Sequence, residues 1–282
     1  MAPPTGSAVR LAAVAGHFGR DLAFDLERIA TIVRHARRAG AGLVVFPDGT
    51  LGGYLGDLRE PDEASLPPAL GRDDPVFAHL AELAGPTALC VGYCELAGGV
   101  RYNAAVCLSG DGVLGRHRKV HQPPGEALVY GAGDRFLAFD TPVGRVGMMI
   151  DHDKTFPESA RSLALDGATV LACLSAWPSS VTRPARQLHR DRQARLFDLY
   201  DQARAAENQV VLVSSNMTGM TGGLRFLGQG KVVGPGGEVL ARTPGQAGLA
   251  VADLDVQAEI DCARRVLHHL KERKPSCYPG LA

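Results

Sequence analysis

The residues best suited to chemistry are ionisable side chains that stand where apolar, strand-like segments end. Asp48, Lys119 and Asp151 each follow such a segment, and Glu126 lies in the proline-rich loop after Lys119. The segment before Asp151, residues 146–150, carries no charge and does not alternate, which is typical of a strand buried on both faces. Because buried strands that end in a sharp turn often carry functional residues, this set predicts a site for proton transfer.

Three carboxyl groups around one lysine would give such a site more negative than positive charge. At least one of Asp48, Glu126 and Asp151 should then keep its proton near neutral pH. We therefore expect one Asp to act as a base and another as an acid, while Lys119 holds a developing oxyanion. Water activation that leads to hydrolysis is one version of this chemistry, and cyclisation, dehydration or isomerisation is another.

The run Asp151, His152 and Asp153 is also a candidate metal site, because carboxylates and imidazole are suitable ligands. Adjacent residues on an extended chain point to opposite sides, so only the two Asp side chains could share a face, and Lys119 would compete for them. We therefore expect no metal and no cofactor, and we interpret His152 as a pocket wall. Cys173 lies inside an apolar strand without an evident base, which indicates a packed thiol and not a substitute nucleophile.

Composition limits the class of protein. A chain of 282 residues with 45% hydrophobic residues can bury a large core, and its 30 basic residues balance 30 acidic ones. Neither nucleic acid nor an anionic membrane is favoured by such a balance. No segment approaches the roughly 20 apolar residues of a membrane span. Most of the six cysteines lie in apolar segments without CxxC spacing, which favours reduced, buried thiols in a cytoplasmic protein.

Apolar periodicity predicts the elements that must position these residues. It predicts alternating strands and helices, with strands at residues 9–16, 43–46, 88–94, 169–174, 210–213 and 249–254 and helices at residues 21–39, 74–84, 157–165, 186–207 and 256–270. Asp-Gly between two strand-like segments predicts a hairpin of residues 101–108 and 113–118, and a second hairpin is expected at residues 228–233 and 238–241.

Domain organisation follows from this order. Residues 51–71 are rich in glycine, proline and charge and predict a surface loop, part of a lid. Two runs of strand and helix, residues 1–118 and 136–270, fit one sandwich of two sheets with helices outside. We therefore expect a single domain over residues 1–282, with a few disordered residues before the first strand and an extended tail at residues 271–282.

Several segments together resemble the nitrilase superfamily of carbon–nitrogen hydrolases. They are VVFPDGTLGGY, GRHRKVHQPPGE, GRVGMMIDHDKTFPE, RAAENQV with SSN after it, and GPGGEVLA. The resemblance covers nearly the whole chain in the family's order. It implies a four-layer α-β-β-α sandwich, a homodimer and a small-molecule substrate.

The family's catalytic residues can be carried across by position. Its Glu, Lys and Cys fall on Asp48, Lys119 and Asp151, so only the lysine is the same residue type. The family's auxiliary Glu falls on Glu126. Tyr54 and Trp177 stand in loops that line the pocket in this family, so the resemblance implies substrate-binding roles for both, and the alternative for an aromatic residue in a loop is that it fills the core. Residues 228–231, GQGK, depart from the small Gly-Ser pair usual there, which implies an altered pocket wall.

Replacing cysteine by Asp151 excludes the family's thioester intermediate. A carboxylate that attacked an amide would form an anhydride, and the tetrahedral intermediate would expel the carboxylate more readily than the amine. Asp151 nevertheless keeps the charge of a thiolate beside Lys119. Asp48 is one methylene shorter than Glu, whereas Asp151 reaches about one atom farther than Cys, so the two changes can compensate within one space.

The expected function is therefore acid–base chemistry on a small amide- or carbonyl-containing metabolite, and a biosynthetic pathway would suit so altered a site. The alternative is a catalytically inactive homologue that binds a small molecule or serves a structural role, with Asp151 paired to Lys119. A deliberate exchange of the nucleophile is disfavoured, because Ala or Ser is the usual choice and Asp48 departs as well. An open pocket where Asp48, Lys119 and Asp151 converge would favour catalysis, and a filled pocket would favour the alternative.

Overall fold

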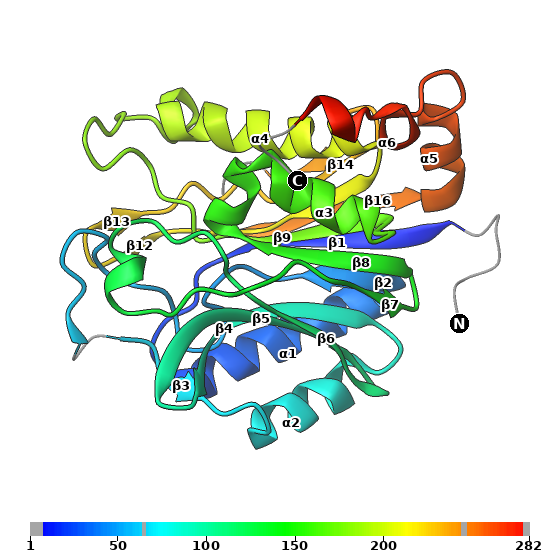
Figure 1. The fold of residues 1–282 in the computed structure, drawn as a ribbon. Helices are drawn as coiled ribbons and strands as arrows, with labels where there is room; N and C mark the ends of the chain where they lie inside the picture. Colours follow the sequence, from blue (N-terminus) through cyan, green and yellow to red (C-terminus); the bar gives the residue numbers. More distant parts are fainter. Residues whose placement is uncertain (1–7, 64–65, 244–246, 279–282) are drawn as a thin grey trace.

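The chain folds as two β-sheets packed face to face, with helices on the outer side of each sheet. The computed structural model describes residues 8–63, 66–243 and 247–278. In Figure 1, α1 and α2 cover the outer face of one sheet, and α3 and α4 cover the outer face of the other. This confirms the predicted α/β sandwich of four layers, α-β-β-α. The disordered start and the end of the tail were predicted for residues 1–7 and 279–282, which lie outside the described residues.

The first sheet has the strand order β11-β1-β2-β4-β5-β6, with β16 beside β1 and β3 beside β4. β1, β2 and β4 run parallel to one another. The predicted β5–β6 hairpin forms, but its turn is Gly110-Asp111, one residue before the expected Asp111-Gly112, because Gly112 already pairs with Ser109. The bounds of its strands are β1 Val9–Gly16, β2 Ala41–Val45, β3 Ala69–Leu70, β4 Ala88–Ala97, β5 Val100–Ser109, β6 Gly112–Arg118, β11 Asn216–Met217 and β16 Gly248–Leu254.

The second sheet has the order β15-β14-β10-β9-β8-β7. Since β8, β9 and β10 are parallel, their carboxyl ends meet at one edge of the sheet. The bounds are β7 Ala138–Thr141, β8 Gly144–Ile150, β9 Val170–Leu174, β10 Val211–Ser214, β14 Lys231–Val233 and β15 Val239–Arg242, and a separate ribbon joins β12 Met220–Thr221 to β13 Leu224–Arg225.

Four of the six α-helices begin at an Asp whose side chain accepts a hydrogen bond from the first turn. These residues are Asp21, Asp74, Asp191 and Asp255, which satisfy backbone N–H groups that the helix leaves open. The helices are α1 Leu22–Arg38, α2 Pro75–Ala84, α3 Pro157–Leu165, α4 Arg192–Asn208, α5 Val256–Ala263 and α6 His269–Glu272. None of the helices in the described residues combines the length and apolar character that a membrane span requires.

Two helix predictions were wrong at their ends, for identifiable reasons. The helix expected from residue 186 begins at Arg192, because the Asp191 carboxylate accepts hydrogen bonds from the backbone N–H groups of Ser180, Ala185 and Gln193. The helix expected over residues 256–270 breaks into α5 and α6. The Gln209 side chain bonds the carbonyls of Ala263 and Leu267 and the N–H of His269, replacing partners within a continuous helix.

The core between the sheets is built from alternate strand positions. Inward residues of both sheets form one apolar cluster that includes Leu43, Cys107, Met148 and Val213. The thiol prediction is confirmed for Cys90, Cys94, Cys107 and Cys173, which are buried and free, and is wrong for the exposed Cys262 and Cys277. The expected extended tail is also wrong at its start, since residues 269–272 are helical and Pro275–Cys277 forms a 3₁₀ turn.

Candidate active site

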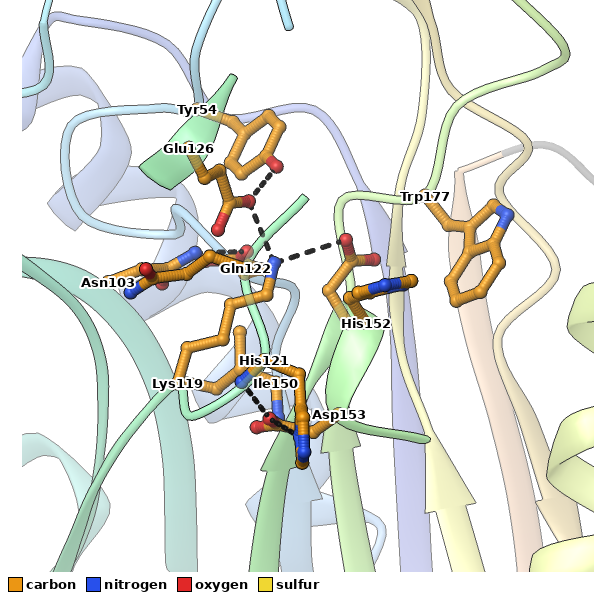
Figure 2. A network of polar contacts seen from close by, with 12 residues as sticks. Tyr54, Asn103, Lys119, His121, Gln122, Glu126, Ile150, His152, Asp153 and Trp177 are labelled. Atoms are coloured by element: carbon orange, nitrogen blue, oxygen red, sulfur yellow. Dashed lines mark hydrogen bonds and ion pairs between the residues drawn. The ribbon is translucent and has the colours of Figure 1, made fainter. Parts of the chain in front are cut away.

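Lys119 is the centre of a fully buried polar group. It follows β6, and its backbone N–H donates to the carbonyl of Asn103 on the neighbouring strand β5, which fixes its position. Its Nζ donates to Glu126 Oε1 at 2.7 Å and to Asp151 Oδ2 at 3.4 Å. Figure 2 shows the Lys119 ammonium and the Tyr54 hydroxyl converging on Glu126. Lys119 therefore joins carboxylates from two separate segments.

Glu126 and Tyr54 support the lysine from within the protein. Glu126 begins the 3₁₀ turn Glu126–Leu128, its Oε1 accepts from both Lys119 and the Tyr54 hydroxyl, and its Oε2 has no partner among the described residues. Both side chains are buried, and neither is among the residues that line the cavity described below. The geometry of Glu126 and Tyr54 therefore indicates that they position Lys119 and do not contact a ligand directly.

Asp48 follows the end of β2 and lies close enough to Lys119 to feel its charge. Its Oδ2 accepts from Asn103 Nδ2 at 2.9 Å, and within the described residues it forms no ion pair with Lys119. Gly92 on β4 allows this approach, since an added Cβ would lie 2.8 Å from Asp48 Cα. The three residues Asp48, Lys119 and Asp151 thus share one neighbourhood, but Glu126 and not Asp48 is the second ion-pair partner of Lys119.

The buried charges shift one another's protonation. Burial, reinforced by the charges of Glu126 and Asp151, raises the pKa of Asp48 to about 8, against the opposing influence of Lys119 and Asn103. Burial also raises the pKa of Glu126. Burial alone would lower the pKa of Lys119, but the carboxylates of Glu126, Asp151 and Asp48 together raise it above its usual value. Near neutral pH the site therefore combines a protonated Asp48 with a charged Lys119.

Asp151 is the carboxylate that reaches open space. It follows β8 and begins the 3₁₀ turn Asp151–Thr155, with φ of 48° in the left-handed region that side chains other than glycine rarely adopt. Its side chain is buried apart from a small exposed fraction, and Oδ1 has no hydrogen-bond partner among the described residues. Such backbone strain persists where the surrounding structure holds it, which is common at functional sites.

Asp153 is the residue that holds this turn. Its carboxylate accepts from the backbone N–H groups of Ile150, Val120 and His121, and the ring nitrogens of His117 and His121 lie 2.9 and 3.1 Å from it. Figure 2 shows His121 and Ile150 directed toward Asp153. Burial would raise the pKa of Asp153, but the hydrogen bonds from His117 and His121 lower it below its usual range.

The hydrogen bonds of Asp153 also determine whether Asp151, His152 and Asp153 can form a metal site. Because Asp153 uses both oxygens on protein donors, neither oxygen is left for an ion shared with Asp151. In the described residues no group of three or more His, Cys, Asp or Glu side chains is arranged to hold a metal ion. The strand ends at Ile150, as expected, but the residues after it form a 3₁₀ turn and not the extended chain assumed for Asp151, His152 and Asp153.

A cavity of about 400 Å³ opens beside Asp151. Both His152 and Trp177 line it, as do a loop after Trp177 and the first turns of α4. His152 Nδ1 lies 3.2 Å from the Thr155 hydroxyl, and burial lowers the pKa of His152, so the ring is neutral near pH 7. Trp177 is fixed by a hydrogen bond from its indole N–H to Gln193 at 3.0 Å. A larger cavity of about 700 Å³ lies along α1, β1 and β16, but no residue of the Lys119 group lines it.

A second buried charge cluster was missed by the sequence analysis. Lys154 and Lys231 donate to the two oxygens of Asp201, each at 2.7 Å, and all three side chains are fully buried. Lys154 also lies over the rings of Phe197 and Trp177. The sequence does give a partial signal, since Lys231 belongs to the GQGK segment that differs from the family pattern and Lys154 directly follows Asp153. Nothing in the sequence links either lysine to Asp201.

Cys173 is buried in β9, with its Sγ 3.7 Å from the Ser175 hydroxyl. Burial raises the pKa of this thiol to about 12, which leaves it in the unreactive protonated form. Its geometry is that of a packed side chain.

Comparison with known proteins decides the family. The sequence profile of the carbon-nitrogen hydrolase family matches residues 10–264. A nitrilase from Pyrococcus abyssi is 33% identical over 229 residues, which cover 79% of this chain and 81% of the relative. The chain belongs to the carbon–nitrogen hydrolase family, the nitrilase superfamily.

Solved structures of carbon–nitrogen hydrolases share the fold. A carbon-nitrogen hydrolase from Helicobacter pylori superposes with a TM-score of 0.83 at 23% identity, covering 99% of both chains. A mutant of an amidase from Nesterenkonia sp. superposes with a TM-score of 0.78 at 23% identity, covering 99% of this chain and 98% of the other. That amidase carries the acetamide moiety of fluoroacetamide, covalently added at its active site cysteine.

Proposed function

We propose that this chain is a nitrilase-fold enzyme that works without a cysteine nucleophile, by acid–base chemistry on a small amide- or carbonyl-containing metabolite. The observation that supports this most is the position of Asp151. It stands where the resemblance places the family's cysteine, it lines a cavity of about 400 Å³, and its Oδ2 lies 3.4 Å from Lys119 Nζ. The relatives act on carbon–nitrogen bonds, so hydrolysis of such a bond is the favoured reaction.

In this proposal each residue of the site has a role. Asp151 takes a proton from water, and the hydroxide adds to the substrate carbon while the carbonyl electron pair moves onto the oxygen beside Lys119. The carbon–nitrogen bond then breaks, and the leaving nitrogen takes a proton that comes from Asp48 by way of Lys119, since Asp48 does not line the cavity and its pKa of about 8 keeps it protonated near neutral pH. Asp151 returns its proton to Asp48 to regenerate the site. Cyclisation, dehydration and isomerisation would use the same acid and base without adding water.

The alternative is an inactive homologue that binds a small molecule. The open cavity beside Asp151 and His152 serves this interpretation as well, because a ligand can occupy it without reacting. The buried Asp48 favours catalysis, since a pocket that only binds a ligand does not need a second, protonated carboxyl group near Lys119.

Oxygen tracing tests both points together. A panel of small amides and ureido compounds is incubated with the protein in ¹⁸O-labelled water, and products and protein peptides are analysed by mass spectrometry under single-turnover conditions. Base catalysis by Asp151 predicts label in the product and none in the Asp151 peptide. Label in that peptide would indicate a covalent acyl carboxylate and contradict the proposed role. Binding without turnover of any compound would favour the inactive homologue.

We further propose that the protein is a cytoplasmic homodimer. Large apolar side chains are exposed on neighbouring elements, namely Leu165, Leu199, Val266 and Leu267. α4 contacts both α3 and α6, and Figure 1 shows these helices together over the second sheet. Exposed apolar surface of this kind marks interfaces between subunits.

A further inference from the structure

The cavity beside Asp151 has an unbalanced charge. Its lining consists of hydroxyl, amide, aromatic and aliphatic side chains, and Asp151 is its one carboxylate. No lysine or arginine of the described chain lines it, and the remaining ionisable groups, His152 and Tyr200, do not offset a negative charge. A ligand that enters this space therefore meets a carboxylate with no cation on the cavity side.

The bonding of Asp151 is incomplete as well as uncompensated. Lys119 gives its shorter bond, 2.7 Å, to Glu126, and only a 3.4 Å contact to Asp151 Oδ2. Asp151 Oδ1 has no hydrogen-bond donor among the described residues, although only 5% of the residue's surface is exposed. A buried carboxylate with an unpartnered oxygen is costly, and Asp151 is a lining residue of the cavity, so a donor on the ligand would complete the bonding of this carboxylate.

The charge count of the whole site agrees. With Asp48 protonated near neutral pH, the carboxyl groups of Glu126 and Asp151 still outnumber the one ammonium group beside them, that of Lys119. A positive charge on the ligand would add a second cation beside these carboxyl groups. A ligand carboxylate would raise the negative charge instead and would face Asp151 directly.

The rest of the cavity describes the body of the ligand. Leu58, Pro123 and Leu196 supply aliphatic surface, and the faces of Trp177 and Tyr200 suit a flat or cationic group. Ser179 and Thr182 offer hydroxyls but no charge. An uncharged, partly apolar body fits these walls.

We propose that the ligand carries, beside its reacting amide or carbonyl, a protonated nitrogen group with N–H donors, an amidinium, guanidinium or primary ammonium, which donates to the Asp151 carboxylate. This inference deepens the proposed function and rests on it for the statement that the bound compound also reacts. This charge preference distinguishes the site from one that binds an uncharged ligand, because the positive charge of the ligand would pair with Asp151.

Binding of three isosteric probes tests the charge preference on the unaltered protein. Benzamidine, benzamide and benzoate share one ring and differ in the charge of the group presented to Asp151. Isothermal titration calorimetry at pH 7 is expected to give benzamidine at least about tenfold tighter binding than benzamide, and no detectable binding of benzoate. Equal affinity for benzamidine and benzamide, or tighter binding of benzoate, would overturn the proposal.

Matched variants locate the charge. Asp151→Asn should weaken benzamidine by about tenfold or more while it changes benzamide by less than about threefold. Asp134→Asn makes the same change at a surface carboxylate paired with Arg135, outside the cavity, and should leave both affinities unchanged. Circular dichroism confirms that each variant is folded. Benzamidine affinity that survives Asp151→Asn would overturn the proposal.

The outcomes separate this proposal from the proposed function. Because Asp48 is already neutral near pH 7, Asp48→Asn should keep benzamidine binding within about threefold even though it removes the proposed acid. Selective benzamidine binding together with unchanged turnover in Asp48→Asn and Asp151→Asn would defeat acid–base catalysis and leave the ligand class standing. Loss of turnover in both variants without any preference for benzamidine would do the reverse.

Discussion

Asp48 is the residue whose protonation most directly reflects the buried environment of the site. The unfolded chain ionises it at its ordinary pKa of 3.8, whereas burial raises the pKa to about 8 in the folded chain. Between these values the folded state binds more protons than the unfolded state, so the free energy of unfolding falls as the pH rises. The contribution of Asp48 to the free energy of unfolding is therefore fully present at low pH and is lost as the pH rises toward about 8.

We predict that Asp48→Asn flattens this dependence. The slope in the wild type reaches about 1.4 kcal/mol per pH unit for one group, and the variant lacks that group's share because Asn does not titrate. Urea denaturation between pH 5 and pH 8 measures the difference, with Asp166→Asn at a partly exposed carboxylate as the control. Parallel curves for the wild type and Asp48→Asn would show that Asp48 is ionised across this range.

At the scale of elements, the 3₁₀ turn Asp151–Thr155 depends on Asp153. Three backbone donors and two imidazoles converge on this one carboxylate, which ties the turn to the loop after β6. The left-handed Asp151 lies at the start of the turn and lacks such bonds of its own. The position of Asp151 is thus determined by a neighbour two residues away.

We predict that Asp153→Asn destabilises the fold by about 2–4 kcal/mol, because the amide removes a charged acceptor and leaves buried donors unpaired. Chemical denaturation measures this loss. Asp140→Asn, at an exposed carboxylate paired with Arg145, should cost less than about 1 kcal/mol. A variant as stable as the wild type would contradict the role assigned to Asp153.

The cluster of Lys154, Asp201 and Lys231 connects the same turn to α4 and β14. We predict that Asp201→Asn costs about 3–5 kcal/mol, since it leaves two buried ammonium groups without their shared partner. Asp198→Asn removes a partly exposed partner of Lys231 and should cost less than about 1 kcal/mol. Replacing the three buried residues together, by Lys154→Met, Asp201→Leu and Lys231→Met, should recover most of the loss. Equal costs for the two single Asp variants would contradict this account.

At the scale of the whole molecule, the exposed apolar side chains of α3, α4 and the C-terminal segment form the proposed dimer interface. We predict that light scattering after size-exclusion chromatography gives twice the chain mass of 29.7 kDa. Leu199→Asp with Val266→Asp should give a monomer, because two charges on each subunit would face an apolar partner. Met220→Asp, an exposed apolar position on β12, is the control. A wild-type monomer at micromolar concentration would contradict the interface.

Much of the fold could be predicted from the sequence because its signals are local. The uncharged strand 146–150, the hairpin of β5 and β6 and the capped helices each follow from periodicity and turn chemistry over a few residues, although the hairpin turn lies one residue before the Asp-Gly pair. The break between α5 and α6 could not, since it depends on Gln209, a residue more than fifty positions away in sequence. Helix ends set by distant side chains leave no periodic signal.

The site divides in the same way. That Asp48, Lys119 and Asp151 follow strands could be read from the sequence, and the structure places them in one neighbourhood. The closer pairing of Lys119 with Glu126, and the Lys154 and Lys231 pairs with Asp201, depend on how loops and helices pack. Such pairings join residues with no fixed spacing, so only the folded chain shows them.

The most direct test of the central claim is the initial rate of Asp48→Asn and Asp151→Asn on a substrate identified from the metabolite panel. Loss of a general acid or base should lower kcat/KM by about a hundredfold or more in each variant, while Asp134→Asn stays within about twofold of the wild type. Both variants should keep the wild-type circular dichroism spectrum. Unchanged rates in Asp48→Asn and Asp151→Asn would contradict acid–base catalysis by this site.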